Sequence, residues 1–182
     1  MHWSLRPWLL VLIAALVGGC SSMKAEDYAG TQPTLVLEDY FLGEVRAWGI
    51  FQDRSGKLRR QFTVDIDGRL EGGELVLTED FVYADGEQSQ RVWRIRRIDE
   101  HRYEGRAADV VGVATGLAYG NALNWRYDLN LKVGEDTYRV HFDDWMFLHE
   151  DGVLVNRAAM SKLGIHLGDV TLFFQRRDGA GM

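Results

Sequence analysis

The chain has 182 residues, a formal net charge of −6, a pI of about 5.4 and one cysteine. Lysine and arginine are scattered among the acidic residues, which argues against a nucleic-acid partner and against adhesion to anionic lipid through the overall charge. A lone cysteine excludes an internal disulfide, and the length suits a single domain with a sizeable core.

Residues 1–19 have the features of a signal peptide, namely a basic start and an apolar run that is short for a membrane span. The segment ends in LVGGC, which resembles the bacterial lipobox. The cysteine of a lipobox, here Cys20, carries acyl chains. The alternative is an ordinary signal peptide followed by a chance cysteine. Several acyl chains give a lasting hold on a membrane. Ser21 after the cysteine favours sorting to the outer membrane, so we predict a lipid-anchored protein that faces the periplasm.

Residues 20–32 are polar and without periodicity, which predicts a lipidated tether. The folded domain is then expected over residues 33–178. Its first half contains five strand-like stretches with period-two alternation, bounded by Gly, Asp and Asn. In one of them Glu79 lies on the apolar side, out of pattern, while the arginines of the last stretch resemble a solvated face. The five stretches are Leu35–Phe41, Val45–Gln52, Leu58–Asp67, Leu75–Ala84 and Arg91–Ile98.

Tyr103–Val111 is expected to continue the sheet. After it the alternation lapses, and glycines recur four residues apart at Gly112, Gly116 and Gly120. Because glycine lowers both helix and strand propensity, we expect a loop here, and the segment is far too short for a membrane helix.

Three further strands with tight turns are predicted between Asn121 and Arg157. In the first, apolar side chains from Leu123 to Val133 alternate with polar ones, so that one face is core. In the second, Asp144 shares its face with apolar residues. A carboxylate there costs several kcal/mol unless it is paired. Arg157 is the nearest cation in the following strand, so we predict that it pairs with Asp144.

After Arg157, residues 158–168 are expected to form a helical turn or a corner, before a last strand at Asp169–Arg176. Short antiparallel strands with tight turns and no repeat favour an all-β fold with little helix. We predict an up-and-down β-barrel of about eight to ten strands, with a two-sheet sandwich as the alternative. A barrel of this size can hold one small ligand.

Many separate motifs in order over the mature chain resemble the bacterial lipoprotein family of domain of unknown function 3833. The resemblance implies an envelope lipoprotein with a calycin-like, lipocalin-resembling barrel, and it implies no established activity. The motifs are AWGIFQDRSGKLRRQFTVDIDG, LTEDFVYADGE, RVWRI, EGRAADVVGVATG, GNALNWRYDLNLKV, YRVHFDDWMFL, VLVNRAAMSKLGI and GDVTLFFQ.

Tryptophan and tyrosine suit a pocket that grips an acyl chain and orients a head group, although plain core packing explains any single one of them. Arg157, with Asn156, could pair a carboxylate or phosphate head group. One hypothesis is therefore a module that binds a fatty acid, lysophospholipid or similar amphiphile in lipid transport or membrane maintenance. Its predicted ligand-binding residues are Trp48, Glu79, Trp125, Phe142, Asp144, Trp145, Asn156 and Arg157.

A lipid-modifying enzyme is the alternative from another class. Glu79 and Asp144, if buried together, could act as general acid and base, because burial would separate their pKa values. Alternatively, these carboxylates have a purely structural role, in an ion pair of Asp144 with Arg157 or of Glu79 with an arginine. The other polar candidates are Asp80, His141, Asp143, His149 and Lys162.

The histidines of that set have no third ligand at metal spacing, and no nucleophile or phosphate-binding motif occurs. We therefore expect neither a metal nor a cofactor. A third alternative is a structural envelope protein with a filled barrel and an unidentified protein partner.

Overall fold

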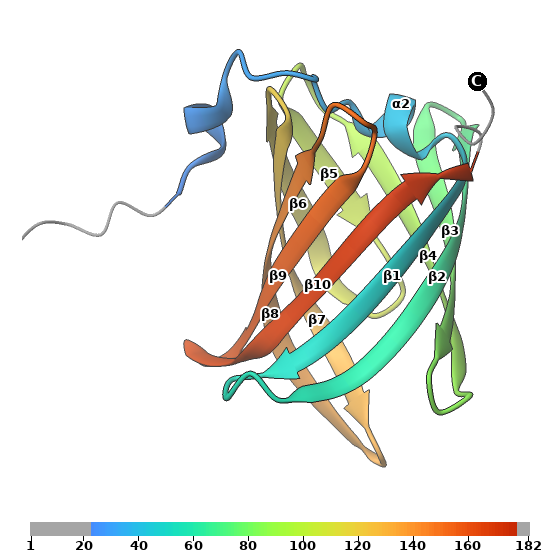
Figure 1. The fold of residues 1–182 in the computed structure, drawn as a ribbon, viewed down its shortest axis with the longest axis vertical. Coiled ribbons are helices and arrows are strands. Elements are labelled where there is room, and N and C mark those ends of the chain that lie inside the picture. The colour runs from blue at the N-terminus through green and yellow to red at the C-terminus, as the bar shows by residue number, and fades with distance from the viewer. Residues whose placement is uncertain (1–22, 178–182) are drawn as a thin grey trace, which may run out of the picture.

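Ten antiparallel strands close into a barrel in the computed structural model, which describes residues 23–177 (Figure 1). Each strand pairs with its neighbours in the sequence, and pairing of the first with the last closes the barrel. The prediction of an all-β up-and-down barrel with little helix is confirmed. The strands are β1 (Gly43–Asp53), β2 (Leu58–Glu71), β3 (Glu74–Tyr83), β4 (Gln88–Arg97), β5 (Arg102–Arg106), β6 (Val110–Tyr119), β7 (Ala122–Val133), β8 (Asp136–Leu148), β9 (Leu154–Lys162) and β10 (Ile165–Arg176).

The alternation of β7 and β8 places one set of side chains inside the barrel, as predicted. Trp125 and Leu129 of β7 are buried, and so are Val140 and Phe142 of β8. Because successive side chains of a strand point to opposite faces, the same strands present most of their charged residues to the outside, with Asp144 of β8 as an exception.

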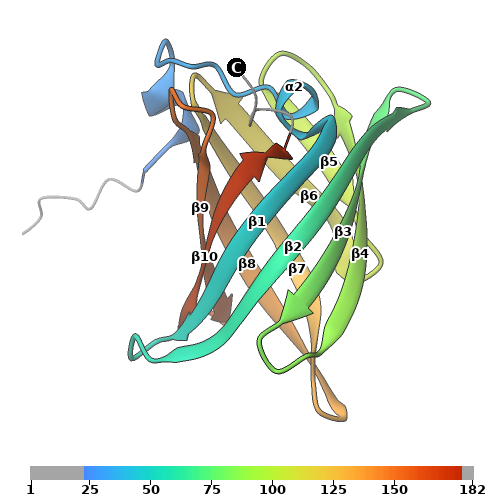
Figure 2. The ribbon, with the colours of Figure 1, turned by 45° about the vertical axis from the view of Figure 1, so that its right-hand side comes forward.

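A short helix, α2 (Leu37–Phe41), lies across one end of the barrel in both views (Figures 1 and 2). The strand predicted at Leu35–Phe41 is therefore wrong. Leu37, Tyr40 and Phe41 are spaced three and four residues apart, which places them on one face of a helix, and all three are buried. The Tyr40 hydroxyl donates to the Phe174 carbonyl at 3.0 Å, which ties the helix to β10.

The glycine-rich stretch predicted as a loop forms most of β6, so that prediction is also wrong. Gly112 has a φ of +77° where the register with β7 shifts, which is the geometry of a β-bulge. Gly116 lies under the ring of Trp125, so close that an added Cβ would meet a ring carbon at 2.4 Å. These glycines serve a bulge and a close packing contact within a strand.

Replacing Gly116 with alanine is expected to lower the free energy of unfolding by about 3 kcal/mol, since the new methyl group must displace the buried Trp125 ring. Thermal unfolding of the variant measures the loss. Thr115→Ala, one residue earlier and exposed, is the control and should cost less than about 0.5 kcal/mol. Equal stability of the Gly116 variant and the wild type would contradict the packing described.

The segment predicted as a corner after Arg157 is the continuation of β9, a tight turn and the start of β10. Lys162 pairs with Ile165 across Leu163 and Gly164, which both have positive φ. The last strand therefore begins at Ile165, four residues before the predicted start.

The chain before the barrel carries a 3-10 helix, η1 (Ala25–Tyr28), on the outer face. Tyr28 packs against the rings of Trp145 and Phe147 at centroid distances of 6.1 and 5.2 Å. Part of the predicted tether thus lies against the barrel. The predicted signal peptide and Cys20 lie outside the described residues, and no helix within residues 23–177 is long and apolar enough to cross a membrane.

Candidate functional site

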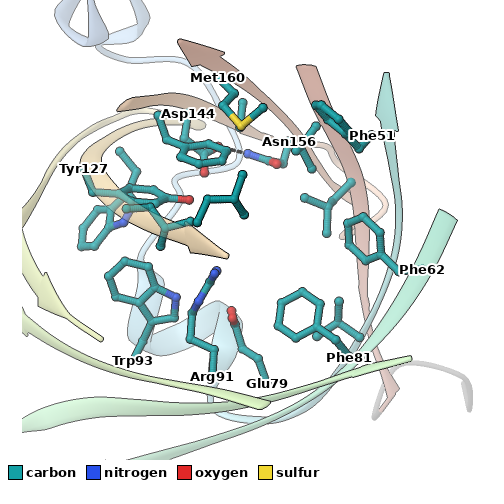
Figure 3. A pocket seen from close by; sticks show the side chains of 18 of the residues that line it. Phe51, Phe62, Glu79, Phe81, Arg91, Trp93, Tyr127, Asp144, Asn156 and Met160 are labelled. Carbon is teal, nitrogen blue, oxygen red and sulfur yellow. Dashed lines mark hydrogen bonds between the residues drawn. The ribbon is translucent and has the colours of Figure 1, made fainter. Parts of the chain in front are cut away.

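The barrel encloses a cavity of about 710 Å³ (Figure 3). It extends from α2, where Leu37 and Phe41 line it, to the turns at the other end of the barrel. Most of the lining is apolar or aromatic. The aromatic lining residues are Phe41, Phe51, Phe62, Phe81, Tyr83, Trp93, Trp125, Tyr127, Phe142 and Phe174.

Basic side chains lie at the end of the cavity away from α2, which we call the mouth. Arg59, Arg60 and Lys132 line the cavity there. The Arg60 guanidinium lies 3.8 Å from the centre of the Tyr83 ring and pairs with Glu87 at 2.7 Å. The mouth therefore combines positive charge with aromatic surface.

Halfway along the cavity, an acidic and a basic side chain lie side by side on β3 and β4. Glu79 and Arg91 are cross-strand neighbours, and both point into the cavity in Figure 3. Arg91 also donates two hydrogen bonds to Asp109 Oδ2, at 2.7 and 3.0 Å. Burial raises the pKa of Glu79 to about 7, against the opposing effect of the Arg91 charge.

On the facing wall, Asp144 of β8 accepts a hydrogen bond from the Asn156 side chain of β9, drawn dashed in Figure 3. Burial raises the pKa of Asp144 to about 7, and the bond from Asn156 opposes that rise. The same amide group donates to the Trp145 carbonyl at 3.2 Å, but Asn156 Oδ1 is buried without a hydrogen-bond partner. A buried acceptor of this kind calls for a donor.

An aromatic wall connects the two polar groups. The Tyr127 ring stacks on Phe142 at 5.1 Å and meets Trp93 edge-on at 5.4 Å, and Trp93 meets Trp125 in the same way at 5.8 Å. Figure 3 shows the Tyr127 hydroxyl directed into the cavity. Burial raises the pKa of Tyr127 well above its ordinary value, so this hydroxyl stays protonated.

The arrangement is that of an apolar pocket with a few polar groups that can orient a ligand. Glu79 and Asp144 can each exchange a proton near neutral pH, because their pKa values are about 7. Within residues 23–177 no three His, Cys, Asp or Glu side chains gather in a way that could hold a metal ion.

Residues 14–176 match the family described as "Protein of unknown function (DUF3833)". The chain belongs to this family. The resemblance carried by the sequence motifs is thereby confirmed, whereas acylation at Cys20 stays a prediction. A comparison with curated proteins gave no match.

The fold of this DUF3833 protein is similar to that of the S-type phycobiliprotein lyase CPES from Guillardia theta. The TM-score is 0.57 and the sequence identity 9%, over 78% of this chain and 93% of the other. A similarity at this identity concerns the fold, and it agrees with the calycin-like barrel that the family resemblance implied.

Five of the residues predicted to bind a ligand come together in the cavity of the DUF3833 barrel. They lie on four different strands, β3, β7, β8 and β9, so only the closed barrel brings them to one site. These residues are Glu79, Trp125, Phe142, Asp144 and Asn156.

The other three predicted ligand-binding residues lie outside the cavity, and their assignment is corrected here. Trp48 is 45% exposed on the outer face of β1. Trp145 follows the inward-facing Asp144 and therefore points outward, where Tyr28 covers it. Arg157 follows the inward-facing Asn156 in the same way, and its side chain is 72% exposed.

The predicted pairing of Asp144 with Arg157 is wrong for the same reason. Arg157 lies opposite Trp145 on the outer face and approaches Asp169 at 3.4 Å. Asp144 has Ala158 as its direct neighbour on β9 and takes its hydrogen bond from Asn156.

The prediction missed Arg91 and Asp109 as site residues. The arginines of the Arg91–Ile98 stretch resemble a solvated face, yet Arg91 stands two and four residues before Trp93 and Ile95, which are both buried. That period-two spacing was the available signal. Asp109 lies in the turn before β6, where no pattern in the sequence indicates its contact with Arg91.

Proposed function

We propose that this protein binds one apolar or amphiphilic molecule, such as a fatty acid or lysophospholipid, inside its barrel. The cavity of about 710 Å³ carries the proposal, because ligand pockets typically measure about 300–1,000 Å³ and are mostly apolar with few polar groups. The alternative of a structural protein with a filled barrel is not compatible with a cavity of this size.

The charges favour an acyl tail that points inward and a head group at the mouth. Halfway along the cavity the carboxyl groups of Glu79 and Asp144 line the wall, and the one guanidinium there, of Arg91, is already engaged by Asp109. An anionic head group in that region would face repulsion and desolvation. Arg59 and Arg60 at the mouth offer the donors that carboxylate and phosphate groups require.

The polar groups halfway along the cavity suit an uncharged polar part of the ligand. Asn156 Oδ1 has no partner and can accept a hydrogen bond, and the Tyr127 hydroxyl is directed into the cavity (Figure 3). A ligand hydroxyl or amide group at this depth would satisfy both.

The proposed setting is the bacterial envelope. Acyl chains on Cys20 would hold the protein in the outer membrane, with the barrel in the periplasm, where it serves lipid transport or membrane maintenance. The support is the lipobox-like LVGGC sequence. Mass spectrometry of Cys20→Ala beside the wild type tests the anchor, since only the wild type should carry the acyl mass.

Titration with an environment-sensitive apolar dye tests the binding function. The dye should bind at a saturating ratio of one per chain, and a fatty acid or lysophospholipid should displace it. Uptake that does not saturate, or that no amphiphile reverses, would contradict the proposal.

A lipid-modifying enzyme is the second candidate function, and the pKa values near 7 of Glu79 and Asp144 in one cavity favour it. Asp144→Asn separates the two functions, because an enzyme should lose turnover whereas a carrier should keep its ligand. Incubation of candidate lipids with each protein, followed by lipid mass spectrometry, measures turnover.

A further inference from the structure

Exposed apolar side chains gather on two adjacent turns at the mouth of the barrel. The β1–β2 and β9–β10 turns are neighbours because β1 pairs with β10, and the Arg54 amide donates to the Leu167 carbonyl at 2.9 Å (Figure 1). Leu163 is 94% exposed, Ile165 61% and Leu58 46%. We call these three side chains, with the basic residues around them, the mouth patch.

Leu163 occupies a backbone conformation that does not suit leucine. Its φ is +50°, and Gly164 follows with a φ of +77°, which is the pattern of a hairpin turn that favours Asn-Gly. A branched apolar residue here strains the backbone and packs against almost nothing. The barrel gains no stability from this side chain, which indicates a role outside the fold.

Positive charge surrounds these apolar tips. Arg54 and Lys57 are exposed in the β1–β2 turn, and Arg59 follows with half of its side chain exposed. Lys162 adds a fourth cation beside Leu163 and lies 4.3 Å from the Tyr138 ring centre. The one acid of the β1–β2 turn, Asp53, is engaged by Arg59 at 2.5 Å.

We propose that the mouth patch docks the barrel on a lipid bilayer with anionic head groups, with Leu58, Leu163 and Ile165 inserted among the lipids. The proposal rests on the proposed function, since docking at the mouth would let an acyl chain pass between bilayer and cavity. The net charge of −6 belongs to the whole chain, whereas the four cations of the patch, of which Arg59 is paired with Asp53, act at a bilayer within a screening length of about 10 Å.

Vesicle flotation tests the proposal. The chain from Ser21 onward contains every described residue of the barrel and is the form to use. It should float with vesicles of phosphatidylglycerol and phosphatidylcholine, and much less with phosphatidylcholine alone. Lys57→Gln should weaken binding about fivefold, as expected when one basic residue near the surface is lost. Equal binding to both vesicle types, or to neither, would overturn the proposal.

Leu163→Asn is the decisive variant, because asparagine tolerates a positive φ and the turn should form at least as well as before. It should bind anionic vesicles about tenfold more weakly, with an unchanged or higher melting temperature. Leu70→Asn is the matched control, since Leu70 is 55% exposed near the β2–β3 turn at the other end. Unchanged vesicle binding by Leu163→Asn would overturn the proposal.

Dye uptake by the same proteins distinguishes docking on the bilayer from ligand binding in the cavity. Leu163→Asn should take up the dye as the wild type does, because the cavity is intact. Wild-type protein that takes up the dye but ignores anionic vesicles would overturn docking and leave the binding function standing. Vesicle binding without dye uptake would overturn the binding function.

Discussion

Replacing Ala158 with phenylalanine is expected to weaken uptake of a fatty acid or lysophospholipid by about a hundredfold, which corresponds to about 3 kcal/mol. Ala158 is buried, lines the cavity and lies directly opposite Asp144 on the neighbouring strand. A phenyl ring attached there must occupy the space that the ligand needs. Displacement of the apolar dye measures the change in affinity.

Ala159→Phe is the matched control, since this residue is the next one on β9 and faces outward. It should bind as the wild type does. Ala158→Leu should give an intermediate loss, which guards against misfolding of the larger variant. Undiminished uptake by a folded Ala158→Phe protein would show that the ligand binds elsewhere.

Asp144→Asn is expected to raise the free energy of unfolding at pH 8 by about 2 kcal/mol and to change it little at pH 4. Burial raises the pKa of Asp144 to about 7, so the folded protein keeps this proton at pH values where an unfolded chain has lost it. The stabilising contribution is complete below the unfolded pKa of about 4 and is lost as the pH rises to 7. An amide cannot ionise and avoids that loss.

The measurement is thermal unfolding of both proteins between pH 4 and 8. A gain of about 2 kcal/mol corresponds to a rise of about 4–8 °C in Tm for a chain of this size. Asp143→Asn, one residue earlier on the outer face, is the control and should not raise the free energy of unfolding at pH 8, because it removes a carboxylate that pairs with Arg126. A destabilised Asp144→Asn protein at pH 8 would mean that the buried carboxylate is well solvated or paired.

The sequence predicted the barrel well because the alternation of β7 and β8 is regular. The alternation of β3 and β8 likewise placed Glu79 and Asp144 on the apolar faces of these strands, and both line the cavity. A polar residue out of phase on a strand was therefore the most informative signal for the site.

The errors at Trp48 and Arg157 have separate physical causes. Trp48 is out of step with the buried positions Val45 and Ala47 in the alternation of β1 and therefore faces outward, although tryptophan is a residue type that suits a ligand pocket. Arg157 alternates in step with Val155, and both face outward, because Leu154 and Ala158 fill the inward face of β9. Both faces of this strand carry apolar residues, so the sequence does not show which of them is inside.

Other features depended on tertiary contacts that no local pattern records. Gly116 stays in a strand because the Trp125 ring from the next strand needs its space. Asp109 belongs to the site because its turn meets Arg91 of β4. The helical spacing of Leu37, Tyr40 and Phe41 in α2 was visible in the sequence. Over only five residues, however, the same stretch was equally compatible with a strand.

Native mass spectrometry of the protein purified from a membrane-containing host, followed by lipid extraction, tests the central claim most directly. The chain from Ser21 onward is predicted to carry one amphiphile per molecule, and the Ala158→Phe variant to carry none. A wild-type protein that has only the mass of the bare chain, and keeps it after incubation with fatty acids and lysophospholipids, would contradict the claim that the cavity binds a lipid.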